Sequence, residues 1–254
     1  MTTPARPFRP AILQRRVAHL TLGRRAAPDT IAAMAEHDRW LIVSALLIAA
    51  ACGLGFVLLA MMVNGVGPVA FDEPVIAFMQ GLPVPVGVWE FVTALGGPVL
   101  ITIDVVVVII LVRRRELVLA ALFGGTLILV ALGVDHAKDF VARPRPDDPL
   151  VSAYGYSFPS GHAFTSTVSY GLLAFIAWRS DLPLRTRRLI VAAAVLLVTL
   201  IGCSRIALGV HYPTDVVAGW LGGLAVLASV VAITTWWSAR SPSPRDSDIL
   251  TDDA

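Results

Sequence analysis

The chain has 254 residues, of which 56% are hydrophobic and only 15% are charged, and its mean hydropathy is +0.75. A soluble domain carries about 25% charged residues, so this composition excludes an ordinary soluble protein and indicates a membrane protein with polar tails. The formal net charge of +2 identifies no partner, because the positions of the charges matter more than their sum. Two cysteines, Cys52 and Cys203, give no basis for a disulfide framework or a thiolate metal site.

The two ends of the chain are polar. Residues 1–39 hold seven arginines and no cleavage-site pattern, which is typical of a basic cytoplasmic tail and not of a signal peptide. A short amphipathic helix on anionic lipid, around residues 12–22, is the alternative to a solvated tail. Residues 238–254 are rich in Ser, Pro and Asp and are typical of a disordered cytoplasmic tail. The sequence therefore predicts one membrane domain, residues 40–237, between two tails.

Six apolar segments are expected to cross the membrane and to form an all-α bundle. A hydrocarbon core of about 30 Å needs about 20 helical residues, and the first segment is an uncharged run of 24 residues. The proline-containing segment after it has no Lys or Arg and indicates a loop with an interfacial helix over 71–82. The predicted spans are residues 40–63, 92–112, 117–134, 163–178, 189–202 with its continuation, and 216–237.

The basic residues predict the orientation of this bundle. With the N-terminus inside, sixteen arginines lie in inside segments, and only Lys138, Arg143, Arg145 and Arg205 lie outside. This distribution follows the positive-inside rule and predicts a multi-pass protein of the cytoplasmic membrane with both termini in the cytoplasm. These exceptions belong to the polar motifs described next, which accounts for their position.

Three short polar motifs interrupt the apolar sequence. They are residues 138–146 (Lys-Asp-Phe-Val-Ala-Arg-Pro-Arg-Pro), residues 159–162 (Pro-Ser-Gly-His), and residues 204–215, which contain Ser204, Arg205, His211 and Asp215. The first motif follows the third span, the second opens the fourth, and the third joins the fifth to the sixth. All three therefore emerge on the same side of the membrane, where we expect them to meet.

The cations of these motifs suit a phosphate group. Lys138 and Arg145 are seven residues apart, so on one helix they would project from the same face, and an arginine fork grips two phosphate oxygens at once. Arg205, from the third motif, could add a third cation around the same phosphate. Taken singly, each cation could equally be a juxtamembrane residue that binds lipid headgroups. Ser160 and Gly161 precede a span, where unpaired N–H groups attract an anion, although Ser160 also suits a plain N-cap.

The two histidines of the motifs differ in their neighbours. Asp215 follows His211 by four residues, and a carboxylate on one ring nitrogen leaves the other free to attack phosphorus, so we expect His211 to be the nucleophile. His162 has no such neighbour in sequence and suits a general acid. A single histidine at a membrane edge is more often structural, but two histidines with an aspartate and three cations favour catalysis.

In their order and spacing, these motifs resemble those of the type 2 phosphatidic acid phosphatase (PAP2) family of integral membrane lipid phosphatases, which is related to the vanadium haloperoxidases. They match Lys-x6-Arg-Pro, Pro-Ser-Gly-His and Ser-Arg-x5-His-x3-Asp over 78 residues. The resemblance implies a six-helix membrane bundle with an outward-facing, metal-independent site and no cofactor. It assigns His211 as the phosphorylated nucleophile, Asp215 as its orienting carboxylate and His162 as the acid. The phosphate-binding residues would be Lys138, Arg145, Ser160, Gly161 and Arg205.

Two local points stay open. Arg143-Pro144 repeats Arg145-Pro146, so the choice of Arg145 as the phosphate ligand rests on spacing alone. Asp104 lies within the second predicted span, where a charge costs about 2.5 to 3.5 kcal/mol on insertion scales. It should therefore face the bundle interior, in either a functional role or a structural hydrogen bond.

The leading hypothesis is a lipid phosphatase that removes a terminal phosphate from a lipid phosphate or diphosphate. The resemblance offers undecaprenyl diphosphate, phosphatidic acid and phosphatidylglycerol phosphate as substrates, with membrane lipids and no nucleic acid as partners. A lipid phosphotransferase and a non-catalytic lipid-phosphate binding or transport protein are the alternatives, and the oligomeric state stays open.

Overall fold

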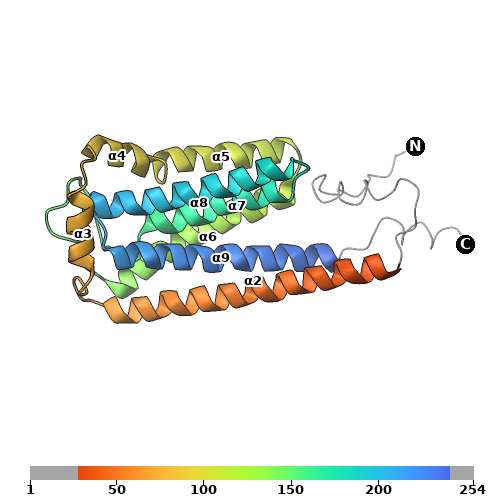
Figure 1. Cartoon of the computed structure of the whole chain (residues 1–254), viewed down its shortest axis with the longest axis horizontal. Helices are drawn as coiled ribbons and strands as arrows, with labels where there is room; N and C mark the ends of the chain where they lie inside the picture. Colours follow the sequence, from red (N-terminus) through yellow and green to blue (C-terminus); the bar gives the residue numbers. More distant parts are fainter. Residues whose placement is uncertain (1–27, 241–254) are drawn as a thin grey trace, which may run out of the picture. The chain divides into compact units, whose positions relative to one another are not determined.

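The computed structural model describes residues 28–240, and every regular element in that range is an α-helix. The predicted all-α class is confirmed for this range. Most of both predicted tails, including the alternative helix over residues 12–22, lies outside it. The helices, labelled as in Figure 1, are α2 (Pro28–Val63), α3 (Asp72–Gln80), α4 (Val86–Ala94), α5 (Pro98–Arg113), α6 (Leu117–Val141), α7 (Gly161–Trp178), α8 (Leu184–Ala207) and α9 (Pro213–Arg240).

The chain divides into two compact units, residues 1–48 with 228–254, and residues 49–227. The described part of the first unit consists of the beginning of α2 and the end of α9. In it, the Trp40 indole donates to the Glu36 carboxylate at 3.5 Å, and Thr235 is buried. Because α2 begins at Pro28, residues 28–39 of the predicted tail are helical. All the predicted site residues belong to the second unit.

Within residues 28–240, five helical stretches are long and apolar enough to cross a membrane. They are Asp38–Val63, Val86–Arg113, Leu117–Val141, Leu184–Ala207 and Pro213–Ala239. The predicted fourth span, residues 163–178, is helical but is not one of them. The chain is therefore a multi-pass membrane protein by its apolar helices, with α7 as the less apolar member of the bundle.

The position of α7 explains its composition. In the second unit α7 packs against α6 and α8, and α5 contacts both α6 and α7, as the neighbouring ribbons of Figure 1 show. Its side chains Ser166, Thr167 and Ser169 are buried, and the first two bond back to the carbonyl of Ala163. A helix covered by protein on several sides can carry such hydroxyls, which lowers its hydropathy.

Asp104 on α5 faces the interior, as predicted. Its Oδ2 accepts a hydrogen bond of 2.9 Å from Ser169 Oγ on α7. This contact corresponds to the structural alternative, because a carboxylate that is half-buried among apolar helices needs a donor.

The segment before the second predicted span forms two helices. α3 lies across one end of the bundle (Figure 1) and packs on α8, with Val75, Ile76 and Met79 against the buried residues Ala163, Ile206 and Val216. α4 follows it and leads to α5 through Leu95–Gly97. The second span therefore begins earlier than the predicted residue 92, and it is interrupted where two glycines precede Pro98.

The prediction for Lys138 and Arg145 needs correction. α6 does not end near residue 134 but continues to Val141, and its C-cap Ala142 has the left-handed φ of 50°. Lys138 therefore lies on the last turn of α6, whereas Arg145 lies in the loop that follows. The two side chains do not share a helix face, and any approach between them depends on the loop.

Close packing holds the start of α7 against α9. A Cβ atom on Gly219 of α9 would lie 2.8 Å from the Ser160 carbonyl oxygen and 2.9 Å from the Ala163 Cβ. Only glycine fits this approach without displacing the first turn of α7. The backbone N–H of Ser160 also donates to the Asp215 carbonyl at 3.0 Å, so the second and third motifs lie side by side.

Candidate active site

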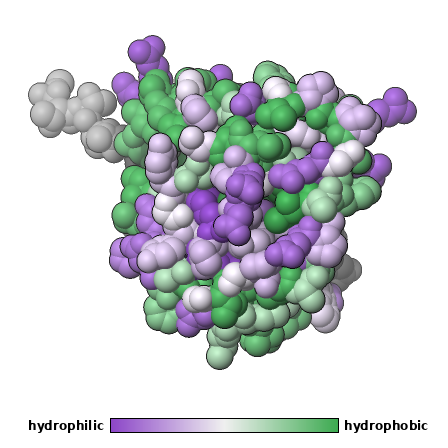
Figure 2. Space-filling view, turned by 90° about the vertical axis from the view of Figure 1, so that its left-hand side faces the viewer, coloured by the Kyte–Doolittle hydropathy of each residue, from purple (hydrophilic) through white to green (hydrophobic). Residues whose placement is uncertain are grey.

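The three motifs meet at the end of the second unit that α3 covers. They come from the last turn of α6 and its loop, the first turn of α7, and the segment from α8 to α9. Figure 2 views this end and shows hydrophilic side chains gathered at the centre of the face, with hydrophobic and further hydrophilic ones toward its edges. The expectation that the motifs emerge on one side of the bundle is borne out by this arrangement.

Ser160 and Gly161 form the floor of the site at the start of α7. Ser160 is the N-cap residue but makes no side-chain cap hydrogen bond, and its buried Oγ has no partner among the described residues. The plain N-cap alternative is therefore not what the structure contains. A Cβ on Gly161 would lie 3.9 Å from Lys138 Nζ, so the amino group of Lys138 reaches the same floor.

Arg145 is held by backbone carbonyls. Its Nε donates to Gly155, its Nη2 to Tyr154 and Tyr156, and its Nη1 to Val210 at 2.6 Å. Nη1 also lies 3.3 Å from Nε2 of His211. The loop therefore places Arg145 beside His211, although Arg145 and Lys138 do not lie on the same helix.

Arg205 on α8 is fixed by a residue that sequence reasoning missed. Its Nη1 donates to Thr93 Oγ1 on α4 at 2.7 Å, and it is only 8% exposed. Its Nε is buried with no partner among the described residues, which leaves this N–H available to an anion. Thr93 carried no motif or spacing that could have revealed this contact.

His211 lies between Arg145 and Asp215 and is 2% exposed. Its buried Nδ1 is 3.5 Å from Asp215 Oδ2, which is within ion-pair distance but longer than a hydrogen bond, and Nδ1 has no hydrogen-bond partner among the described residues. Because the guanidinium that faces Nε2 can only donate, Nε2 is the accepting nitrogen and Nδ1 carries the proton. Burial lowers the pKa of His211 to about 4, so the ring is neutral near pH 7 with its Nε2 lone pair free of a proton.

His162 lies across the site against the break between α4 and α5. A Cβ on Gly97 would be 2.9 Å from His162 Nε2, so glycine is needed there for the ring to occupy this place. Burial, followed by the charges of Arg205, His211, Lys138 and Arg145, lowers the pKa of His162 to about 3. All four groups therefore lie close enough to His162 to act on its charge.

Arg143 and Arg145 have separate places, which answers the question left by the duplicated Arg-Pro. Arg143 is fully buried and pairs with Asp72 at 2.7 Å and Asp215 at 2.6 Å. Its guanidinium lies 4.1 Å from the centre of the Tyr212 ring. Arg143 is thus engaged within the protein, and Arg145 is the arginine beside His211, as the spacing predicted.

The eight predicted site residues all gather at this end of the unit, while Asp72, Thr93 and Arg143 join them without having been predicted. Asp72 was placed only within a predicted interfacial helix, and one acidic residue in such a segment gives no signal of burial. Within residues 28–240, no group of three His, Cys, Asp or Glu side chains has an arrangement that could hold a metal ion.

Comparison with known proteins agrees with this geometry. The PAP2 superfamily model matches residues 119–239, which include all three motifs. Phosphatidylglycerophosphatase B of Bacillus subtilis is 35% identical over 108 residues, covering 39% of this chain and 53% of the relative. Decaprenylphosphoryl-5-phosphoribose phosphatase of Mycobacterium tuberculosis is 40% identical over 101 residues, covering 38% of this chain and 50% of the relative. The chain thus spans about half the length of these curated relatives.

A solved structure extends the similarity to the fold. The crystal structure of a transmembrane PAP2 type phosphatidylglycerolphosphate phosphatase from Bacillus subtilis superposes with a TM-score of 0.66 and 26% identity. The superposition covers 73% of this chain and 95% of that one. Residues 119–239 thus match the PAP2 superfamily, and the chain resembles PAP2 phosphatases in sequence and in helical fold.

Proposed function

We propose that the chain is a membrane lipid phosphatase that hydrolyses a terminal phosphate from an amphiphilic phosphate monoester or diphosphate. One observation carries the proposal: His211 presents an unprotonated Nε2 to Arg145 at 3.3 Å while its Nδ1 faces Asp215. A neutral histidine oriented by a carboxylate and flanked by a cation is suited to attack phosphorus.

In the first step, Nε2 of His211 attacks phosphorus and the bond to the lipid oxygen breaks. The positive charges of Lys138, Arg145 and Arg205 stabilise the negative charge on the phosphoryl oxygens. The Ser160 hydroxyl and the N-terminus of α7 supply further hydrogen-bond donors. The leaving oxygen takes a proton from His162, so the lipid departs as an alcohol or as a monophosphate.

In the second step, a water molecule attacks the phosphohistidine. It gives a proton to His162, the bond from phosphorus to Nε2 breaks, and inorganic phosphate leaves with His211 restored. In the free site, burial and the charges of three nearby cations, Arg205, Lys138 and Arg145, lower the pKa of His162 to about 3. A bound phosphate offsets their charge, which raises the pKa and equips His162 to carry the proton.

The substrate class follows from the surroundings of the site. The polar centre seen in Figure 2 has hydrophobic side chains among its neighbours, which suits a headgroup at the centre and an acyl or prenyl chain at the membrane. The relatives' names concern phosphatidylglycerophosphate and decaprenylphosphoryl-5-phosphoribose. Together with undecaprenyl diphosphate and phosphatidic acid, these form the substrate panel.

The test is phosphate release by the detergent-purified protein from each lipid of this panel and from a soluble phosphate ester, in EDTA. We expect release from at least one lipid, and no release from any lipid by the His211→Ala variant. Transfer of phosphate to an added alcohol in place of release would favour a transferase. Binding of the lipids without turnover would contradict an enzymatic function.

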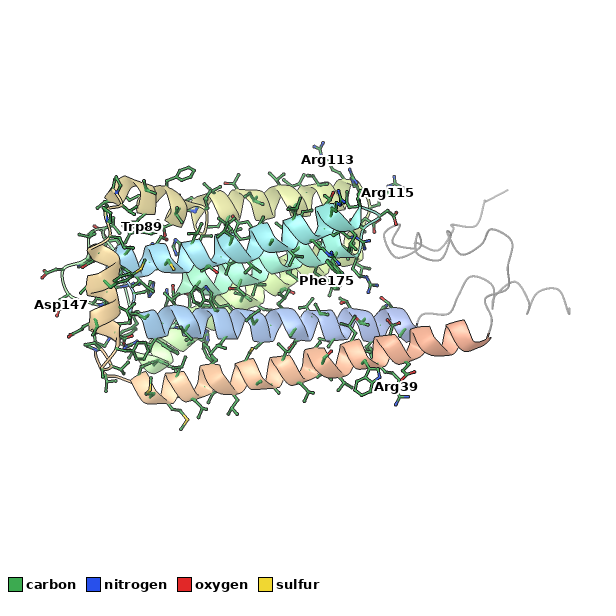
Figure 3. The ribbon with its side chains drawn as sticks, viewed as in Figure 1. Arg39, Trp89, Arg113, Arg115, Asp147 and Phe175 are labelled. Carbon is green, nitrogen blue, oxygen red and sulfur yellow. The ribbon has the colours of Figure 1, made fainter. Side chains whose placement is uncertain are left out.

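We further propose six membrane spans, with α7 as the fourth, both termini in the cytoplasm and the site facing outward. The distribution of arginines supports this orientation. Figure 3 labels Arg113 and Arg115 at the end of the second unit opposite to Asp147, which belongs to the loop of the first motif. A protease added to intact cells should spare a tag at either terminus, and cleavage of either tag would overturn the topology.

A further inference from the structure

A buried ionic cluster lies behind the candidate nucleophile. Asp72, Arg143 and Asp215 are each fully buried, and Arg143 lies between the two carboxylates. Its Nε and Nη2 also donate to the Gly67 carbonyl, at 3.3 and 3.0 Å. Burying three charges is costly unless each is paired and hydrogen-bonded, and here each is both.

Thr214 links Asp72 to the third motif. Its hydroxyl accepts a 2.6 Å hydrogen bond from Arg143 and contacts both carboxylate oxygens of Asp72 at 3.0 Å. The backbone N–H of Thr214 donates to Asp72 Oδ1 at 3.1 Å. Asp72, on α3, therefore fixes the first residues of α9, although the two helices are far apart in the sequence. The residue that it holds, Thr214, immediately precedes Asp215.

Arg143 also sets the orientation of Asp215. It donates to Oδ1 at 2.6 Å, while the Tyr212 N–H donates to Oδ2 at 2.9 Å. With both oxygens held, Oδ2 is directed at Nδ1 of His211. The carboxylate cannot turn away from the histidine without losing one of these hydrogen bonds.

The formal charge of the cluster suits the chemistry of His211. Two carboxylates and one guanidinium leave one excess negative charge beside a neutral imidazole. When Nε2 forms a bond to phosphorus, the ring keeps its proton on Nδ1 and becomes a cation, so the buried cluster and the ring together approach neutrality. A fixed charge placed where the opposite charge develops stabilises that state.

We propose that Asp72 is a positioning residue for the nucleophile, acting through Arg143 and Asp215 to orient His211 and to favour its phosphorylated, cationic form. This role rests on the proposed phosphohistidine mechanism. The role belongs to Asp72 alone among the residues of α3, and no atom of this helix has to touch the substrate.

The test compares Asp72→Asn with Glu73→Gln. Both substitutions remove one negative charge from the first turn of α3, but Glu73 is exposed whereas Asp72 is in the cluster. With a short-chain phosphatidic acid, or the best lipid of the panel, we expect Asp72→Asn to lower kcat roughly 10- to 100-fold, as for groups that orient metal-binding histidines. KM should change by less than about threefold, because phosphate-binding groups are untouched.

The readout that separates positioning from a structural role is the rate of phosphoenzyme formation. Labelled substrate and an alkaline quench measure it in a single turnover, and we expect it to fall with kcat in Asp72→Asn and to stay unchanged in Glu73→Gln. Equal rates for Asp72→Asn and the unaltered protein would overturn the inference and leave the proposed function intact. No phosphoenzyme and no phosphate release by the unaltered protein would overturn both.

Folding is checked by thermal melting and gel filtration of each variant. If Asp72→Asn does not fold, Thr214→Val replaces it, because this isosteric change removes only the hydroxyl between Arg143 and Asp72. We expect Thr214→Val to lower phosphoenzyme formation in the same direction. Failure of both variants to fold, with Glu73→Gln folded, would make the cluster a folding element and contradict the positioning role.

Discussion

Arg145 Nη1 lies 3.3 Å from His211 Nε2, and this arginine is held in place by four backbone carbonyls. The arrangement requires all three guanidinium nitrogens. An arginine that is fixed in this way places its positive charge beside the atom that we propose to attack phosphorus.

We predict that Arg145→Lys lowers kcat/KM by about 100-fold or more, the range for loss of one transition-state donor. Lysine keeps the charge but cannot reach the carbonyls of Tyr154, Gly155, Tyr156 and Val210 together. Steady-state phosphate release from the preferred lipid measures the change. Activity close to that of the unaltered protein would show that charge alone suffices and that the fixed geometry has no role.

Thr93 offers a second test, because its hydroxyl holds Arg205 at 2.7 Å. A hydrogen bond to a charged group contributes about 1.5 to 3 kcal/mol, and about 1.4 kcal/mol corresponds to a factor of ten. We therefore expect Thr93→Val to lower kcat/KM by about tenfold or more. The matched control, Thr93→Ser, retains the hydroxyl and should stay within a few fold of the unaltered protein.

Loss of activity in both Thr93 variants would assign the effect to packing of α4. Unchanged activity in Thr93→Val would mean that Arg205 needs no support from α4, or takes no part in binding phosphate. Inhibition by inorganic phosphate, compared between Arg205→Gln and the unaltered protein, separates the last two outcomes, because this affinity falls only if Arg205 is a phosphate ligand.

Gly97 tests the position of His162. A Cβ at residue 97 would lie 2.9 Å from His162 Nε2, which is closer than atoms in van der Waals contact. We therefore expect Gly97→Ala to displace the His162 ring. The expected loss of kcat is about tenfold or more, within the range for general acid–base catalysis. Gly87→Ala is the control, since a Cβ there meets no atom within 4 Å. Similar kcat values in both variants would contradict a catalytic place for His162.

The pKa of His211, lowered to about 4 by burial, predicts two pH effects. The ring should stay neutral down to about pH 4 and not titrate near 6.5 as an unperturbed histidine does. Between these values the unfolded chain binds more protons than the folded one, so the free energy of unfolding should fall as pH decreases from about 6.5 toward 4.

Nitrogen NMR of the histidine-labelled protein measures the first effect without interference from ionisation of the substrate. The resonances of His211 are assigned by their loss in His211→Asn. Titration of these resonances near pH 6.5 would show that Asp215 and solvent outweigh burial, and the neutral nucleophile would then need a different explanation at acidic pH.

Sequence alone could predict the residues of the three motifs, because their spacing is long and specific and because the parity of the spans brings them to one side. The spacing favoured Arg145 over Arg143 as the phosphate ligand; Arg145 is the arginine that lies beside His211, and its contact with phosphate stays a prediction. The expectation that Lys138 and Arg145 project from one helix face was wrong, because α6 ends between them at the left-handed Ala142. The loop after α6, and not a shared helix, brings Arg145 to the same end of the unit as Lys138.

Asp72 and Thr93 could not be predicted in the same way. Each is a single residue of a common type in a helix before the first motif, and each takes its role from a partner far along the chain, Arg143 and Arg205 respectively. The apolar residues of α7 likewise predict a membrane span without showing what surrounds it. Its hydroxyl side chains are buried because the neighbouring helices α6 and α8 cover them, and the sequence does not show this cover.

The measurement that tests the central claim most directly is covalent labelling of the protein by its lipid substrate. The purified protein is mixed with terminally labelled lipid phosphate, quenched in alkali, and digested for mass spectrometry. We predict a phosphoryl group on His211, formed at a rate no slower than kcat and absent from His211→Ala. Label on another residue, or phosphate release that continues in His211→Ala, would contradict the assignment of His211 as the nucleophile.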